Sequence, residues 1–292
     1  MTLGLQAVFM LPSDKLRAKS VRRQFEKSLS GSGSQFDLSL CALLIAAEEE
    51  AGVDPEHYLA VLKVWGDSVR SRASSSSQPP LTVLLKFLYQ ELGFRGNQLA
   101  YYDPKNSFLN QVLDRALGIP ISLAVVLIAV GRHAGLQVDG VGMPGHFLVR
   151  VQEPGKPEPV LVDPFCGERI SRSECQRKLD DLFDGQLELQ DEHLCTVSDR
   201  QIVERILRNL KAVYVRYGLN RRALSIADRI LLVVPRSLPD VRDRGTLRAK
   251  VGDFARAIKD FEFFLALNAD GPEVADAAEQ LKRAKMSLAG LN

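Results

Sequence analysis

The last third of the chain repeats itself with a period of 34 residues. Ala223 and Ala257 lie 34 positions apart, and each is followed by apolar residues four and seven positions later. That is the spacing of one face of a helix. The residues that follow the two alanines are Ala227 and Ile230, and Phe261 and Phe264. Repeats of this length stack into one continuous core, so this part of the chain is predicted to be all α-helical.

The same period defines tetratricopeptide repeats, in which two helices of a unit pair closely. Gly245 falls on the small-residue position of the second unit, 12 residues before Ala257, whereas the first unit has Lys211 there. Pro272 opens a further helix, which would cap the stack. We therefore predict tetratricopeptide-like repeats over residues 199–292. A plain array of helical hairpins is the alternative.

The remainder of the chain divides by composition into three segments. Residues 1–37 end in a Gly/Ser run and are predicted to be weakly ordered. Residues 38–80 are predicted to be a helical lead-in, in which Asp54 and Pro55 provide the N-cap and the first position of a helix. Residues 81–198 mix helical periods with two short strands. This segment is predicted to be an α+β core.

Composition excludes several classes of function. The chain has 46% hydrophobic and 25% charged residues, as soluble globular proteins do. A net charge of +2 from 38 basic and 36 acidic residues gives no electrostatic reason to expect nucleic acid or an anionic membrane as partner. No stretch reaches the roughly 18 apolar residues of a membrane span, and the N-terminus lacks the basic start of a signal peptide, so a cytoplasmic location is predicted. The four cysteines and four histidines lack metal-ligand spacing, and neither a metal nor a cofactor is expected.

Three motifs in the core follow one another in the order nucleophile, base and orienting carboxylate. Gly-Ile-Pro-Ile-Ser places Ser122 in the first turn of an apolar helix, Pro-Gly-His places His146 at the start of a strand, and Val-Asp-Pro places Asp163 at the end of the next strand. A helix N-terminus favours developing negative charge. An alcohol, unlike a thiol, needs a base before it can attack. Ser122 could therefore equally be a structural residue of the helix start.

The segment between the two strands, Glu-Pro-Gly-Lys-Pro-Glu-Pro, predicts a hairpin. If its turn is centred on Pro154 and Gly155, His146 lies opposite Asp163 and the two side chains share a face. A shift of one residue would place them on opposite faces. His146 could instead be a structural histidine, and Asp163 could initiate a turn.

Three further residues could belong to this site. Cys166 lies three residues after Asp163 and could be a displaced nucleophile, but it follows a strand rather than opening a helix. Asn106 and Asn110 precede the helix of Ser122, and their amides could line the same cleft as donors. The competing and favoured interpretation of Asn106 is a helix N-cap.

The run NSFLNQVLDRALGIPIS, followed by GMPGHFLVRV and LVDPF, resembles the transglutaminase-like core of the bacterial SirB family. The segment ALLIAAEEEAGVDPEHYLAVL resembles the helical lead-in of that family, and the repeats resemble its C-terminus. The resemblance implies a papain-like α+β core in which a helix N-terminus faces a small antiparallel sheet. It also implies that the catalytic cysteine of active transglutaminase-like enzymes falls at Ser122, the histidine at His146 and the aspartate at Asp163.

Two functions follow from these observations. The favoured one is a non-catalytic protein-interaction or regulatory scaffold that binds a protein or peptide through the cleft and the repeat groove. The alternative is a serine-dependent hydrolase or acyltransferase that acts on amide or ester bonds through the three candidate residues. A hydrogen bond between the Ser122 hydroxyl and His146 would favour the enzyme. A cleft filled by Ile121, Leu123 or Phe147 would favour the scaffold.

Overall fold

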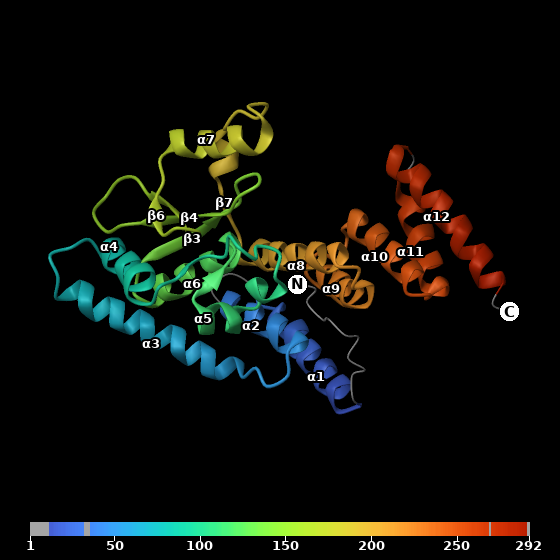
Figure 1. Cartoon of the computed structure of the whole chain (residues 1–292), viewed down its shortest axis with the longest axis horizontal. Coiled ribbons are helices and arrows are strands. Elements are labelled where there is room, and N and C mark those ends of the chain that lie inside the picture. Colours follow the sequence, from blue (N-terminus) through green and yellow to red (C-terminus); the bar gives the residue numbers. More distant parts are fainter. Residues whose placement is uncertain (1–11, 32–35, 269, 291–292) are drawn as a thin grey trace. The chain divides into compact units, whose positions relative to one another are not determined.

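The computed structural model describes residues 12–31, 36–268 and 270–290, and they form two compact units (Figure 1). The first unit comprises Met1–Asn97 and Phe108–Asp199, and the second comprises Gln98–Ser107 and Arg200–Asn292. The prediction of an α+β protein with an all-helical C-terminal region is confirmed.

The described part of the first unit starts with three helices, α1 (Pro12–Ser28), α2 (Leu38–Glu49) and α3 (Pro55–Ser74). The prediction that residues 1–37 are weakly ordered is wrong for α1, while residues 1–11 and 32–35 lie outside the described part. Helix α1 packs on α2: Phe25 is fully buried, and Nε of Arg22 donates to Oε2 of Glu48 at 2.8 Å. Burial of Phe25 and this ion pair stabilise a helix whose Gly/Ser-rich end suggested otherwise.

Four short elements lead to the central helix of this unit. Helix α4 (Pro80–Leu85) continues into a π-helical turn, η2 (Lys86–Glu91), and α5 (Leu109–Arg115) follows the 3₁₀ turn η3 (Pro104–Ser107). Helix α6 (Pro120–His133) is buried along most of its length. An apolar helix of this kind must be covered on all sides, and α2, α3 and α5 contact it together with the sheet.

The sheet has five strands in the order β6-β5-β4-β3-β7, and all of its pairs are antiparallel. Its strands are β3 (Gln137–Val141), β4 (Leu148–Gln152), β5 (Val160–Asp163), β6 (Glu168–Arg169) and β7 (Thr196–Val197). A separate parallel pair joins β1 (Arg95–Gly96) to β2 (Leu117–Gly118). Helix α6 lies against β3 and β4, and Figure 1 shows α7 (Arg172–Phe183) on the opposite side of the sheet. A short 3₁₀ turn, η4 (Asp191–Leu194), precedes β7.

The β4–β5 hairpin has a different register from the predicted one. A turn centred on Pro154 and Gly155 would place Arg150 opposite Pro159, whereas Arg150 pairs with Leu161. The shift has a physical reason, since the prolines of the loop cannot donate hydrogen bonds to a strand ladder and β5 begins after Pro159. A shift of two residues leaves every side chain on its predicted face.

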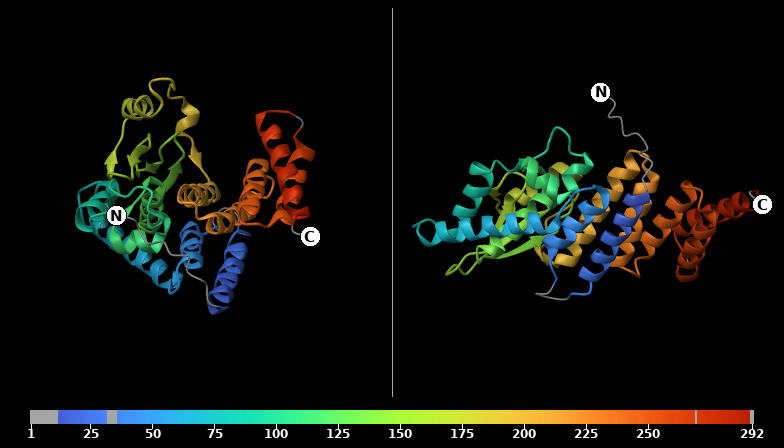
Figure 2. Two further views of the ribbon diagram at one scale, coloured as in Figure 1. Left: turned by 45° about the vertical axis from the view of Figure 1, so that its right-hand side comes forward. Right: turned by 90° about the horizontal axis from the view of Figure 1, so that it is seen from below.

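The second unit consists mainly of five helices: α8 (Asp199–Arg216), α9 (Asn220–Val233), α10 (Leu238–Lys250), α11 (Phe254–Leu267) and α12 (Pro272–Ala289). They are coloured orange to red in Figure 2. Ala223 and Ala257 are fully buried, as the repeat predicts. A Cβ added to Gly245 would lie 2.9 Å from Cε1 of Phe261, which explains the small residue there. Lys211, which departs from the pattern, forms an ion pair with Asp243.

Candidate functional site

His146 and Asp163 lie side by side, as the hairpin argument predicts. Nε2 of His146 is 3.0 Å from Oδ1 of Asp163. The histidine follows Gly145, whose φ of +69° is natural only for glycine, and its N–H donates to the carbonyl of Met143 at 3.1 Å. Asp163 is the last residue of β5. A tight bend before β4 and the end of β5 therefore bring the imidazole and the carboxylate together.

The carboxylate of Asp163 is buried and has three close polar neighbours, His146, Lys178 and the backbone N–H of Phe165. Nζ of Lys178 lies 3.0 Å from Oδ2, and the N–H of Phe165 donates to Oδ1 at 2.9 Å. Burial, the largest influence, acts to raise the pKa of Asp163. The hydrogen bond and charge of His146, the Phe165 N–H and Lys178 together outweigh burial and lower that pKa. Asp163 is therefore ionised at neutral pH and holds His146 in place.

Lys178 is the member of this cluster that sequence reasoning missed. It lies on α7, which begins with a capping box of Ser171 and Glu174. That motif could have predicted the helix. It could not have predicted that Cys175 and Leu179 pack α7 against the sheet and thereby direct Lys178 to the carboxylate.

The turn after Asp163 is fixed by the π-helical segment. The hydroxyl of Tyr89 in η2 donates to the carbonyl of Pro164 at 2.8 Å, and burial, followed by the charge of Asp163, raises the pKa of this phenol. Gly167 has φ +77°, and a Cβ added there would lie 2.2 Å from Cγ of Tyr89. This close contact leaves the turn little freedom, so the position of Asp163 is well defined.

Ser122 lies at the start of α6, as predicted, but its hydroxyl is engaged with the helix itself. It accepts from the N–H of Ile119 and donates to the carbonyl of Ile119, both at 3.1 Å. In the described part of the chain, these are the hydrogen bonds that the Ser122 side chain makes. Ser122 is only 3% exposed. The residue therefore acts as part of the N-terminal cap of α6.

The neighbours of this position are equally enclosed. Ile121, Leu123 and Phe147 are each at most 2% exposed. A Cβ added to Gly118 would lie 2.7 Å from the Ser122 Oγ. Close packing of this kind leaves little room beside the hydroxyl.

A cavity of about 300 Å³ lies on the α7 side of the cluster and has Asp163 in its wall. Its lining is mostly charged and comprises Asp163, Cys166, Glu168, Arg169, Ile170, Glu174, Arg177, Lys178 and Asp181. Cys166 is exposed there, but burial of its thiol and the nearby Asp163 raise its pKa. A raised pKa reduces the fraction of the thiol that is present as the reactive thiolate at neutral pH. In residues 12–31, 36–268 and 270–290, no group of three His, Cys, Asp or Glu side chains could hold a metal ion.

The two asparagines are engaged in separate structural roles. Nδ2 of Asn106 donates to the carbonyls of Ala100 and Tyr101 at 2.7 and 3.1 Å. The favoured interpretation of Asn106 as a helix N-cap is wrong, because Phe108 takes that position in α5. Nδ2 of Asn110 donates to Oε2 of Glu50 at 3.1 Å. Asn106 belongs to the second unit and Asn110 to the first.

Comparison with known proteins agrees with this architecture. The profile of the transglutaminase-like superfamily matches residues 56–208, and a tetratricopeptide-repeat profile matches residues 210–282. A UPF0162 protein of Xylella fastidiosa (strain Temecula1) is 39% identical over 233 residues, which are 77% of this chain and 82% of the relative. The chain belongs to the UPF0162 family of the transglutaminase-like superfamily.

More distant relatives extend the match. The UPF0162 protein of Vibrio cholerae is 34% identical over 198 residues, covering 68% of this chain and 72% of the relative. Human F-box only protein 21 is 25% identical over 186 residues, covering 61% of this chain but 28% of the relative. A crystal structure of menin aligns with a TM-score of 0.39 and 11% identity, over 90% of this chain and 73% of that chain. This similarity is too low to indicate a shared fold. These relatives do not bear the SirB name, and the names of the UPF0162 relatives state no activity.

In the described part of this UPF0162 chain, no helix has both the length and the apolar character needed to cross a membrane.

Proposed function

We propose that this UPF0162 protein is a non-catalytic protein-interaction or regulatory scaffold whose Ser-His-Asp triad is degenerate. The observation that carries the proposal is the engagement of the Ser122 hydroxyl with both backbone groups of Ile119. An attacking serine needs its proton within reach of a base, at about 2.6–3.2 Å or through one water. Here the proton is donated to the backbone carbonyl.

The state of the other two residues is consistent with an inherited framework. Asp163 holds His146 at 3.0 Å and is also bound by Lys178. The carboxylate is thus shared between two partners and is not dedicated to the imidazole. In this proposal the pair serves as a structural junction between the turn before β4, the end of β5 and α7.

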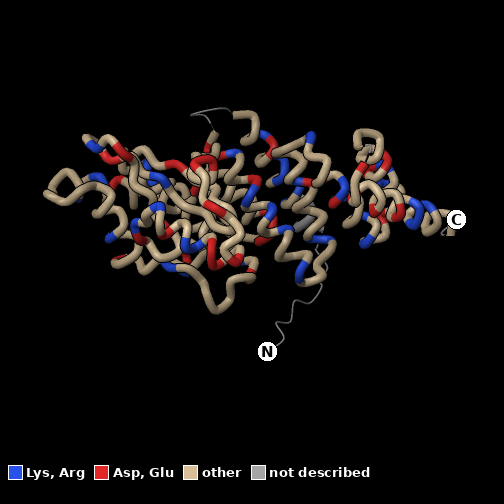
Figure 3. Tube along the Cα trace, turned by 90° about the horizontal axis from the view of Figure 1, so that it is seen from above, with Lys and Arg blue, Asp and Glu red and all other residues tan. Residues whose placement is uncertain are grey.

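The repeat unit supplies the interaction part of the proposal. Tetratricopeptide repeats typically mediate contacts between proteins, and their stacked helices present extended binding surfaces. We propose a protein or peptide partner, bound through the repeat groove and the cleft of the core. Figure 3 shows that basic and acidic residues occur in both units, and the net charge of +2 gives no electrostatic reason to expect nucleic acid as the partner.

The alternative remains a serine-dependent hydrolase or acyltransferase acting on amide or ester bonds. The distance of 3.0 Å between Nε2 of His146 and Oδ1 of Asp163 favours it, since a carboxylate this close is placed to orient an imidazole that acts as base. For that function the Ser122 side chain would have to turn away from Ile119 toward the imidazole.

Alkylation of a Ser122→Cys variant separates the two functions. Iodoacetamide labelling of the full chain, followed by peptide mapping, gives a rate for each thiol. We expect the thiol introduced at position 122 to react more slowly than the exposed Cys166 and Cys195, because this position is enclosed. Adding His146→Ala should leave that rate unchanged. A rate faster than those of the exposed thiols, and slowed by His146→Ala, would contradict the scaffold and support an assembled nucleophile.

A further inference from the structure

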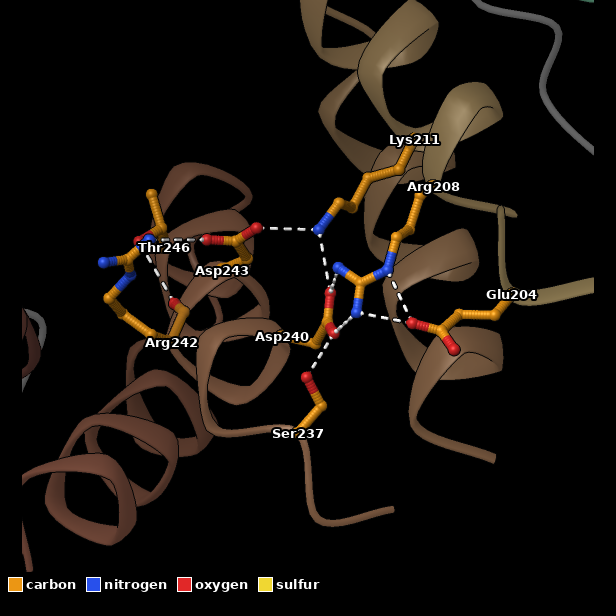
Figure 4. Close-up of polar contacts among 8 residues, drawn as sticks. All are labelled: Glu204, Arg208, Lys211, Ser237, Asp240, Arg242, Asp243 and Thr246. Carbon is orange, nitrogen blue, oxygen red and sulfur yellow. Dashed lines mark hydrogen bonds and ion pairs between the residues drawn. The ribbon is translucent and has the colours of Figure 1, made fainter. Parts of the chain in front are cut away.

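The first helices of the two repeat hairpins, α8 and α10, are joined by a network of charged side chains (Figure 4). Asp240, fully buried, accepts Nη2 of Arg208 at 2.6 Å and Nζ of Lys211 at 3.1 Å. Lys211 also lies 2.7 Å from Asp243. Glu204 and Arg242 complete the network through Arg208 and Asp243. With three cations and three carboxylates, the network is electrically neutral.

The cations of this network are therefore committed to partners inside the protein. Arg208 is held by Asp240 and Glu204, and Lys211 by Asp240 and Asp243. Removing a cation from a buried carboxylate would leave an uncompensated charge, which is strongly destabilising. Lys211 and Arg208 are thus poorly suited to bind an anionic group of a partner.

Next to the network, α10 and α12 line a cavity of about 420 Å³ that is open to the surface, and Glu273 and Asp276 are exposed in it. Its lining comprises Arg242, Asp243, Thr246, Pro272, Glu273, Asp276 and Gln280. Arg242 is paired with Asp243, at 3.3 Å. Among the described residues, neither Glu273 nor Asp276 makes an ion pair. Adding these two carboxylates to the neutral network gives the cavity region a net charge of −2.

Polar side chains hold one of these carboxylates in place. Nε2 of Gln280 donates to Oδ2 of Asp276 at 2.5 Å, and the hydroxyl of Thr246 donates to Oε1 of Gln280 at 2.8 Å. This chain of hydrogen bonds runs from α10 to α12 along the cavity wall. Gln280 already donates to the carboxylate, so Asp276 has acceptor capacity left for a second donor.

We propose that this cavity binds a lysine or arginine side chain of a partner peptide, with Glu273 and Asp276 as its carboxylate partners. The proposal rests on the proposed scaffold function and names the chemistry of its partner. Charge complementarity decides it: the cations beside the cavity are neutralised within the network, and two carboxylates are left. Thr246 and Gln280 supply further polar contacts, and the volume accommodates a side chain with adjoining backbone.

A peptide library tests this proposal on the full chain. Acetylated hexapeptides, random except for one fixed central residue, are presented to immobilised protein, with Arg, Lys, Gln or Glu at the fixed position. We expect the Arg and Lys pools to bind best. The double variant Glu273→Gln/Asp276→Asn should lose at least about ten-fold in affinity for them, since each exposed charge pair at about 4 Å is worth roughly five-fold.

The matched control is Glu262→Gln/Glu279→Gln. It removes two other negative charges, from α11 and α12, at exposed positions outside the cavity lining, where Glu262 pairs with Lys285 and Glu279 with Arg283. This control should bind the cationic pools as the wild type does. Preference for Glu or Gln pools, absence of any preference, or equal losses in both double variants would overturn the proposal. Such a result would not decide the scaffold function, which the Ser122 experiments test independently of the cavity.

Discussion

Replacing Ser122 with Ala tests whether this residue is a helix cap. The change removes the hydroxyl that pairs with the N–H and carbonyl of Ile119. The carbonyl keeps a second donor, the N–H of Leu123 at 3.1 Å. The N–H of Ile119 would lose its partner, and Ile119 is only 5% exposed. An orphaned buried N–H therefore dominates the expected effect.

The magnitude follows from these contacts. A buried donor without a partner costs about 1–3 kcal/mol, and the better helix propensity of alanine returns at most about 0.7 kcal/mol. We expect Ser122→Ala to lower the free energy of unfolding by about 1–2 kcal/mol. Catalytic serines commonly behave in the opposite way, because active-site residues are often kept at a cost in stability.

Urea unfolding followed by tryptophan fluorescence measures this effect in the first unit, to which Ser122 belongs. Trp65 is the sole tryptophan of the chain and lies on α3, beside Phe87 and Phe94. Ser71→Ala is the control for a serine that caps no helix, since Ser71 is exposed on α3, the helix of Trp65. It should change the free energy of unfolding by less than about 0.5 kcal/mol. A Ser122→Ala protein as stable as the control, or more stable than the wild type, would refute the capping role.

Two further changes address the carboxylate and the repeats. Because the folded chain lowers the pKa of Asp163, its ionised form adds stability above the ordinary pKa of about 3.9, and that stability is lost as the pH falls through the lowered value. The stability difference between wild type and Asp163→Asn should therefore shrink between about pH 5 and pH 3 in urea unfolding, and a constant difference would be inconsistent with the ion pairs. Ala257→Trp should overpack the fully buried contact of α11 and cost about 1–3 kcal/mol. An unchanged unfolding midpoint by circular dichroism would count against this packing.

The sequence predicted those parts of the fold that depend on local patterns. The 34-residue offset between Ala223 and Ala257 located the repeats, and Pro-Gly-His and Val-Asp-Pro identified the pair of His146 and Asp163. The hairpin register was wrong by two residues, because a turn of several prolines has no unique centre. The pairing of His146 with Asp163 survived because an even shift keeps each side chain on its face.

The remaining features depend on contacts that local pattern does not encode. Lys178 reaches Asp163 only through the docking of α7, and Asn106 bonds to carbonyls five and six residues earlier instead of capping a helix. The order of α1 also comes from tertiary contacts, through Phe25 and Arg22. The proposed function depends on the orientation of the Ser122 hydroxyl, which bonds to the backbone of Ile119. Residue type alone does not reveal that a serine near a helix start bonds to the local backbone.

Labelling of the wild-type chain with a fluorophosphonate tests the central claim most directly. The probe forms a covalent adduct with a serine only when a base activates the hydroxyl. With an active serine protease as positive control and mass-spectrometric mapping of the adduct, we predict no modification of Ser122. An adduct at Ser122 that is lost in His146→Ala would contradict the account and assign the chain to the serine hydrolases.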